Sequence, residues 1–353
     1  MTSKFKKYIL NFKNPSGTSR GILNIKETFF LEIFDGDKKG IGECALFRGL
    51  SFDDVPAYEE KLTWLCEHIN ENPEVLKQEL QNFPSIWFGY EQAILNLNLP
   101  ENIYFPSEFT EGKSSIKING LIWMGNAAFM QSQIEEKVAQ GFDCIKLKIG
   151  VDWVSEKEIL KHLRQNFSSE ILELRVDANG GFSFDEAKIV LQELVDLEIH
   201  SIEQPIKAIS KEPRTKSQES RNSTDCFVPR NEMAELCAET PTPIALDEEL
   251  IGVINFAEKK QLLEQIKPQY IILKPALVGG FSGCDEWISL AENLNIGWWI
   301  TSALESNIGL NAIAQYTFTK NNKMPQGLGT GALFTNNFPS VLELNGDQLS
   351  FKI

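Results

Sequence analysis

The chain has 353 residues, 42% of them hydrophobic, and a formal net charge of −15 at pH 7. That length can bury one large core or two unequal ones, and the acidity argues against nucleic acid or an anionic membrane as a partner. No stretch reaches the roughly 18–20 apolar residues that a membrane span requires. The N-terminus lacks the apolar core of a signal peptide, and the six cysteines are scattered without paired spacing. We therefore expect a cytoplasmic protein with reduced thiols, without a disulfide frame or a zinc site.

Residues 1–112 are expected to form an α+β capping domain. Its strands are predicted at 7–12, 27–34 and 38–47, and its helices at 54–70 and 85–98. The turn at 35–37 pairs the last two strands as a hairpin. Near the C-terminus, residues 341–353 form a second hairpin around Asn345-Gly346, which we expect to rejoin the N-terminal sheet. The capping domain would then be completed by about 333–353.

Residues 113–332 are organised differently, with short apolar stretches that each end in polar or glycine residues and lead into a helix-like segment. Eight such stretches occur, at 114–120, 144–150, 172–181, 201–206, 242–249, 270–276, 297–306 and 326–331. Most lie about 30 residues apart, the length of a strand with its crossover helix. This spacing predicts an α/β fold, a modified (β/α)8 barrel of the TIM type. A doubly wound open sheet is the alternative, but its glycine-rich phosphate turn is missing after the first strand.

One interval is longer than the others, because 44 residues separate Glu203 from Asp247. The surplus, residues 208–226, is polar and has few large apolar side chains, which is typical of a surface insertion without a catalytic role. It would alter loop contacts and leave the chemistry of the strand ends unchanged.

Charged residues stand at the ends of five consecutive predicted strands. Alternation turns their aliphatic neighbours outward onto the helices, so the charged side chains point into the barrel, where catalytic groups lie. They are Lys146, Lys148, Asp177, Glu203, Asp247 and Lys274. Three carboxylates on neighbouring strands are costly to bury unpaired, and a hard divalent cation offsets their charge. Ligands with oxygen atoms only favour Mg²⁺, for which Mn²⁺ can substitute.

The alternative is that each acid is an ordinary exposed loop carboxylate and that Lys146 and Lys148 lie on a solvated strand face. Three acids in register at strand ends, with lysines on both sides, favour a catalytic site. A free lysine is a weak base at neutral pH, but neighbouring cations favour its neutral form. A lysine beside a divalent cation that holds a carboxylate is suited to remove the proton α to that carboxylate.

The motifs "KLK", "VDAN", "IEQP", "LDEE" and "LKP", in this order and spacing, resemble those of the enolase superfamily and its muconate lactonising subgroup. Four further stretches, "PSGTSRGIL", "FPSIWFGYEQA", "TSALESNIGLNAIAQ" and "PQGLGTGALFTNN", are similar to the o-succinylbenzoate synthases of menaquinone biosynthesis. The resemblance covers nearly the whole chain. It implies an Mg²⁺-dependent lyase that acts on a small dicarboxylate. Such an enzyme dehydrates 2-succinyl-6-hydroxy-2,4-cyclohexadiene-1-carboxylate to 2-succinylbenzoate through an enediolate.

The resemblance also implies a role for each charged residue. The metal ligands would be Asp177, Glu203 and Asp247. Lys148 would abstract the α-proton and help the hydroxyl to depart in a syn elimination, and Lys274 would stabilise the enediolate from across the ring plane. Lys146 would tune Lys148 and contact the substrate carboxylate.

Four further substrate contacts are expected. Asn179 lies two residues beyond a predicted metal ligand, although a simple turn before Gly180-Gly181 is equally consistent with it. Gly329, in "GLGTG", would offer backbone N–H groups to an anion, unless it only closes the barrel. Ser302 ends the seventh stretch, and Arg20 lies on a loop that should cover the barrel mouth.

Two other functions stay open. An N-succinylamino acid racemase or a related epimerase would use the same two lysines on opposite faces of its substrate. The "GLGTG" stretch, which lacks the paired acids that dipeptide epimerases carry on the eighth strand, argues against an epimerase. A non-catalytic binding barrel is the third function, but a complete set of ligands and lysines argues against it. The oligomeric state stays open.

Overall fold

The computed structural model describes residues 1–18, 21–123, 125, 127–208 and 231–353. Arg20 and most of the insertion expected at 208–226 therefore lie outside the described residues. Across the described ranges, no helix is both long and apolar enough to cross a membrane. The five cysteines in these ranges are free thiols.

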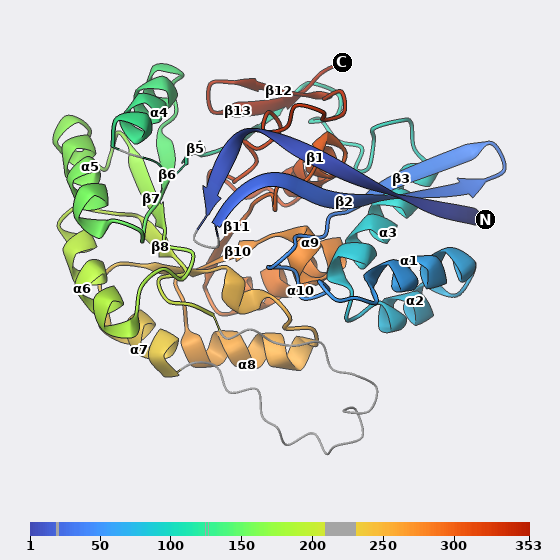
Figure 1. The fold of residues 1–353 in the computed structure, drawn as a ribbon, viewed down its shortest axis with the longest axis horizontal. Helices are drawn as coiled ribbons and strands as arrows, with labels where there is room; N and C mark the ends of the chain where they lie inside the picture. Colours follow the sequence, from blue (N-terminus) through green and yellow to red (C-terminus); the bar gives the residue numbers. More distant parts are fainter. Residues whose placement is uncertain (19–20, 124, 126, 209–230) are drawn as a thin grey trace.

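A three-stranded antiparallel sheet forms the N-terminal part of the fold. Its strands are β1 (Thr2–Thr18), β2 (Gly21–Asp35) and β3 (Lys38–Cys44), and the helices α1 (Tyr58–Glu67), α2 (Pro73–Glu79) and α3 (Pro84–Leu97) follow (Figure 1). The predicted strands, their hairpin and the two predicted helices are confirmed. Helix α2 has seven residues, too few to show helical periodicity. Gly42 lets α3 lie against β3, since a Cβ there would come within 1.9 Å of the Gly89 carbonyl oxygen.

Seven parallel strands in chain order form the second sheet. They are β5 (Gly120–Ile122), β6 (Cys144–Lys148), β7 (Glu173–Asp177), β8 (Ser201–Glu203), β9 (Ile244–Leu246), β10 (Tyr270–Leu273) and β11 (Gly297–Ile300). The sheet closes into a ring where Gln326 bridges Ile118 and Gly327 bridges Thr301. The predicted (β/α)8 barrel is confirmed, with residues 326–327 in the place of an eighth strand.

Helices surround this ring. They are α4 (Ala127–Ala139), α5 (Trp153–Asn166), α6 (Phe184–Val195), α7 (Asn231–Glu239), α8 (Phe256–Ile266), α10 (Gly280–Asn293) and α11 (Asn307–Thr319), with the short segments η1 (Glu248–Leu250) and α9 (Pro275–Val278). Helices α4 to α8 follow one another around the outside of the strands (Figure 1). The aliphatic residues that alternate with the charged ones, such as Ile145 and Leu147, are at most 1% exposed. Their burial confirms the predicted outward packing of these side chains.

The first barrel strand was predicted wrongly at 114–120. Residues Ser115–Lys117 form β4, which pairs antiparallel with β13 (Gln348–Phe351), and the barrel strand β5 begins only at Gly120. Residues 115–120 are shared between two sheets because their backbone N–H groups donate to different segments. Ile118 donates to the Asp347 carbonyl, whereas Asn119 donates to that of Gln326.

The expectation that the C-terminal hairpin rejoins the N-terminal sheet is also wrong. The hairpin, β12 (Leu342–Asn345) and β13, forms a separate sheet with β4. The edge of the N-terminal sheet is used by a preceding segment instead, since the Lys13 N–H donates to the Leu333 carbonyl and the Thr335 N–H to that of Asn11. The boundaries proposed for the two domains, 1–112 with about 333–353 and 113–332, stay a prediction.

One buried carboxylate joins the N-terminal sheet to the barrel. Glu43 of β3 is fully buried and accepts hydrogen bonds from the Ser306 N–H, the Ser306 hydroxyl (2.6 Å) and the Gly309 N–H. These groups belong to the first turn of α11, where a negative charge also interacts favourably with the helix dipole. Thr28 of β2 donates a further hydrogen bond to the same carboxylate.

We expect Glu43→Ala to lower the free energy of unfolding by about 3 kcal/mol, because the donors of α11 would stay buried without an acceptor. Urea denaturation followed by circular dichroism measures this change. Glu111→Ala is a suitable control, because its ion pair with Lys113 is exposed to solvent and should contribute little to stability. Equal midpoints for the two variants would contradict the role of Glu43.

Candidate active site

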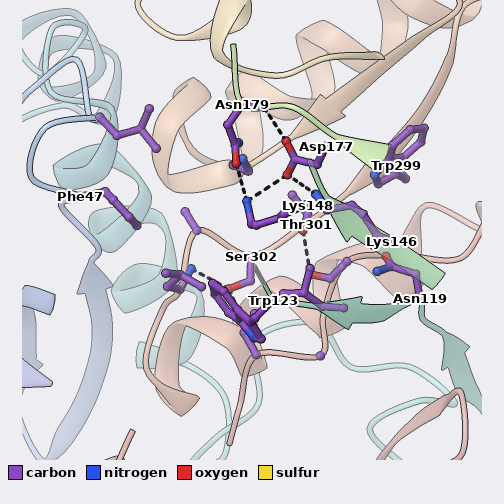
Figure 2. A pocket seen from close by; sticks show the side chains of 18 residues that line it. Phe47, Asn119, Trp123, Lys146, Lys148, Asp177, Asn179, Trp299, Thr301 and Ser302 are labelled. Carbon is purple, nitrogen blue, oxygen red and sulfur yellow. Dashed lines mark hydrogen bonds and ion pairs between the residues drawn. The ribbon is translucent and has the colours of Figure 1, made fainter. Parts of the chain in front are cut away.

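A hollow of about 830 Å³ opens at the carboxyl ends of the barrel strands (Figure 2). Charged side chains from β6, β7 and the end of β10 line it, together with residues of β5, β11 and the segment 327–330. Phe47 and Leu50, from the loop that follows β3, complete its walls. The site is therefore built by both parts of the fold.

Strand register sets the level of the charged side chains in the barrel. In the parallel ladder, Lys148 pairs with Asp177, and Asp177 pairs with Glu203. Asp247 directly follows β9, whose Ala245 pairs with Glu203. The three acids are 1–2% exposed. The predicted inward orientation of these carboxylates is therefore confirmed.

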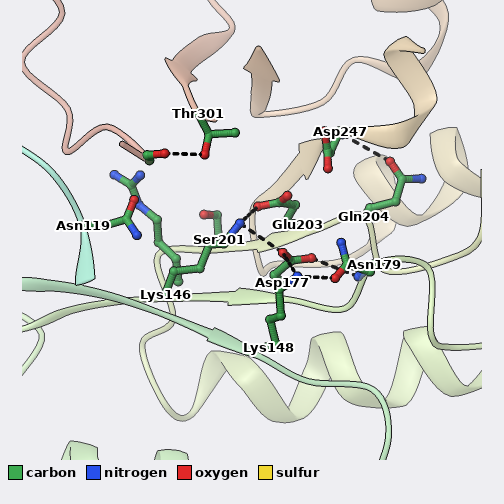
Figure 3. Close-up of polar contacts among 12 residues, drawn as sticks. Asn119, Lys146, Lys148, Asp177, Asn179, Ser201, Glu203, Gln204, Asp247 and Thr301 are labelled. Carbon is green, nitrogen blue, oxygen red and sulfur yellow. Dashed lines mark hydrogen bonds and ion pairs between the residues drawn. The ribbon is translucent and has the colours of Figure 1, made fainter. Parts of the chain in front are cut away.

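The lysines form ion pairs with these carboxylates, and Figure 3 shows the contacts of Lys146 and Lys148. Lys146 Nζ lies 2.5 Å from Glu203 Oε2 and 3.0 Å from Asp177 Oδ2. Lys148 Nζ lies 3.1 Å from the same Asp177 oxygen. Lys274 pairs closely with Asp247 and lies 3.8 Å from Glu203 Oε1. Positive and negative side chains therefore alternate along this chain of contacts, and Lys146 and Lys148 do not form a solvated face.

Two of the acids differ in how easily they ionise. Burial would raise the pKa of Asp177, but the ammonium groups of Lys146 and Lys148 hold it well below its usual range. Burial raises the pKa of Asp247 well above its usual range, and the attraction of Lys274 is opposed by two neighbouring carboxylates. Asp177 forms ion pairs with two ammonium groups, whereas Asp247 forms one and has two carboxylates beside it, which accounts for the contrast.

The donor set fits a hard divalent cation in its chemistry. Asp177, Glu203 and Asp247 supply oxygen atoms only, which Mg²⁺ prefers, and Glu203 Oε1 is buried without a hydrogen-bond partner. In the described ranges, however, no three His, Cys, Asp or Glu side chains are grouped as a ready-made metal site. Lys146 bridges Asp177 and Glu203, so the carboxylates and the lysines form one charged unit.

Asn179 lines the hollow and forms hydrogen bonds with one lysine and one glutamate. Its side-chain oxygen accepts a hydrogen bond from Lys148, and its Nδ2 donates to Glu248 at 3.2 Å. The backbone has a φ of +44°, a left-handed conformation that asparagine tolerates. The turn that the sequence left open as one alternative is therefore present, and Asn179 contacts Lys148 from it. A direct contact of Asn179 with substrate stays a prediction.

Ser302 also lines the hollow, but its hydroxyl is already engaged. It donates to Glu305 at 2.6 Å and accepts from Thr330 at 2.8 Å and from the Leu304 N–H at 3.0 Å. Glu305 is fully buried. These bonds shape the turn after β11, where Leu304 has a φ of +62°. The predicted role of Ser302 as a substrate contact is untested.

The remaining predicted contacts fall in different places. Gly329 lines the hollow, while Arg20 lies outside the described residues.

Sequence reasoning missed several walls of the hollow. Trp123 follows β5, and its backbone N–H and carbonyl are both bonded at 3.0 Å to the side-chain amide of Gln133 on α4. Trp299 of β11 lines the hollow while stacking on the buried Arg175 guanidinium. In the sequence, only the position of Trp123 directly after the apolar stretch "GLI" could have indicated an aromatic wall at this strand end.

Comparisons with known proteins identify the family of this chain. The family model described as "Enolase C-terminal domain-like" matches residues 130–223 and 227–343. The o-succinylbenzoate synthase of Desulfotalea psychrophila is 43% identical over 99% of this chain and 98% of its own length. The N-succinylamino acid racemase of Thermus thermophilus is 30% identical over 83% of this chain and 75% of its own length. The crystal structure of MenC from Desulfotalea psychrophila LSv54 superposes with a TM-score of 0.83 at 40% identity, covering 99% of both chains. This chain belongs to the o-succinylbenzoate synthase family of the enolase superfamily.

Proposed function

We propose that this enzyme is an o-succinylbenzoate synthase that dehydrates 2-succinyl-6-hydroxy-2,4-cyclohexadiene-1-carboxylate to 2-succinylbenzoate in menaquinone biosynthesis. The observation that carries the proposal is the alternation of three lysines and three buried carboxylates at the carboxyl ends of the barrel strands. The 43% identity to a synthase over nearly the full length of both chains supports the choice of substrate.

Members of the enolase superfamily generally use Mg²⁺. In this chain Asp177, Glu203 and Asp247 would hold the cation. When bound, it would supply electrostatic stabilisation of the substrate carboxylate as negative charge develops there. Lys146, between two of these ligands, would contact the same carboxylate.

Lys148 is the base in this mechanism. Its Nζ would take the proton from the carbon that bears the ring carboxylate, and the electron pair would form the new ring double bond as the hydroxyl leaves. The same ammonium group would return a proton to the departing hydroxyl on the same face, which releases water. The products balance as 2-succinylbenzoate, water and an unchanged lysine.

Lys274 lies on the opposite side of the hollow, because β6 and β10 are four strands apart in a ring of eight. An ammonium group there would stabilise the enediolate across the ring plane without exchanging a proton. Phe47, Leu50 and Trp123 would enclose the ring and exclude water.

Racemisation of an N-succinylamino acid is a second candidate function. Two lysines on opposite sides of the substrate could exchange a proton on each face, and the racemase of Thermus thermophilus is 30% identical to this chain. The non-catalytic barrel has no such support.

Metal removal tests the ligand set. EDTA should abolish turnover and Mg²⁺ or Mn²⁺ should restore it. Asp177→Asn, Glu203→Gln and Asp247→Asn should each weaken Mg²⁺ binding by at least about tenfold and abolish turnover, because each removes a ligand charge. Calorimetry and a coupled dehydration assay measure both effects.

Glu248→Gln is the matched control, because Glu248 neighbours the predicted ligand Asp247. If Glu248→Gln loses more Mg²⁺ affinity and turnover than Asp247→Asn does, the ligand that follows β9 is Glu248 and not Asp247.

The two lysines should differ in what their loss does. Lys148→Ala should lower kcat by about 10²–10⁴-fold or more and stop exchange of the α-proton with solvent, since no other base reaches that face. Lys274→Arg keeps the positive charge but cannot give up a proton. It should therefore retain measurable dehydration but lose racemisation of an N-succinylamino acid.

Proton exchange in deuterated water, followed by NMR, separates these cases. Metal binding and circular dichroism of each variant serve as controls for folding. If folded Lys274→Arg is as inactive in dehydration as Lys148→Ala, Lys274 is an obligatory acid or base and the mechanism has two proton carriers.

A further inference from the structure

Lys146 stands at the centre of the alternating charges. Figure 3 shows its ammonium group between Asp177 and Glu203, at 3.0 and 2.5 Å from their carboxylate oxygens. Among the three lysines of the hollow, Lys146 alone lies within hydrogen-bond distance of two carboxylates. Lys148 reaches Asp177, and Lys274 reaches Asp247 but stays 3.8 Å from Glu203.

The charges of this set are nearly balanced without any bound ion. Three ammonium groups offset three carboxylates, and Glu248 adds one negative charge beside Asp247. A divalent cation would therefore add two positive charges to a buried set that is already within one charge of neutrality. Repulsion by an ammonium group about 4 Å away should lower the affinity for such a cation by at least about tenfold in this environment.

We propose that Lys146 is an internal counter-ion of the metal-binding carboxylates, which makes a divalent cation and a doubly negative ligand bind together. Its charge between Asp177 and Glu203 keeps a divalent cation from binding tightly alone. A dicarboxylate offsets the added charge, so each of the two favours the other. Since the dicarboxylate is the one that the proposed function assigns, the inference deepens that function and rests on it.

The position of Lys146 distinguishes this role from simple contact with the substrate. If a substrate carboxylate touches the cation, the two bind cooperatively whatever the lysines do. A lysine that serves only the substrate would leave binding of the cation alone unchanged. A counter-ion competes for Asp177 and Glu203, so loss of its charge must strengthen binding of the cation in the absence of any dicarboxylate.

The experiment is calorimetric titration of Mg²⁺ into the full-length enzyme, alone and with saturating 2-succinylbenzoate or benzoate. In the unaltered enzyme, 2-succinylbenzoate should strengthen Mg²⁺ binding by at least about tenfold and benzoate by less. Mg²⁺ should strengthen 2-succinylbenzoate binding by the same factor, as thermodynamic linkage requires. In Lys146→Met, Mg²⁺ alone should bind at least about tenfold tighter, and the coupling should shrink.

Two control variants isolate the charge. Lys146→Arg keeps the positive charge and should bind Mg²⁺ alone as weakly as the unaltered enzyme. Lys259→Met removes the ammonium group of another lysine, which is buried and paired with Glu286 between α8 and α10. It should leave Mg²⁺ affinity unchanged even if it lowers stability. If Lys146→Met does not fold, Lys146→Gln, which keeps a hydrogen-bond donor without the charge, replaces it.

Unchanged or weaker binding of Mg²⁺ alone in folded Lys146→Met or Lys146→Gln would overturn the counter-ion role. Tighter binding in Lys146→Arg as well would overturn it too, because charge would not be the cause. Turnover of the unaltered enzyme separates this failure from that of the proposed function. An enzyme that dehydrates its substrate with Mg²⁺ but lacks these shifts refutes the counter-ion alone, whereas one without turnover or Mg²⁺ binding refutes both.

Discussion

The active site depends on one constraint, the register of the parallel barrel strands. Because Lys148, Asp177 and Glu203 pair with one another across β6, β7 and β8, their side chains reach the interior at one level. A buried carboxylate without a partner would cost several kcal/mol. Register places an ammonium group beside each acid, so the barrel can bury three carboxylates at 1–2% exposure. A one-residue slip in any of these strands would turn its charge outward onto the helices.

The N-terminal sheet also helps to form the active site. Glu43 bonds the start of α11, and the turn that precedes α11 carries Ser302 and Leu304 into the hollow. The loop that follows β3 brings Phe47 and Leu50 to the same hollow. The charged floor of the site therefore comes from the barrel alone. Its apolar walls depend on how the two parts of the fold pack together.

This division explains how much could be predicted from the sequence. Strand spacing and alternation are local patterns, and they predicted the barrel and the inward orientation of Asp177, Glu203 and Asp247. The break between Ser115–Lys117 and Gly120 depends on which carbonyl groups Ile118 and Asn119 meet, which is a tertiary outcome. For the same reason, no periodicity marks Trp123 as a wall of the hollow. Its position is held by Gln133, ten residues away on α4.

Lys274 and Lys148 have different charged surroundings, which favour different roles for the two lysines. Burial would lower the pKa of Lys274, but the carboxylates of Asp247 and Glu203 raise it, so this lysine is held in its charged form. A permanently charged group suits electrostatic support of an anion. At the other end, Lys148 shares Asp177 with Lys146, and its second partner is the neutral amide of Asn179. Lys148 therefore lies beside fewer carboxylates than Lys274 does, and this difference in surroundings is consistent with the different roles proposed for the two lysines.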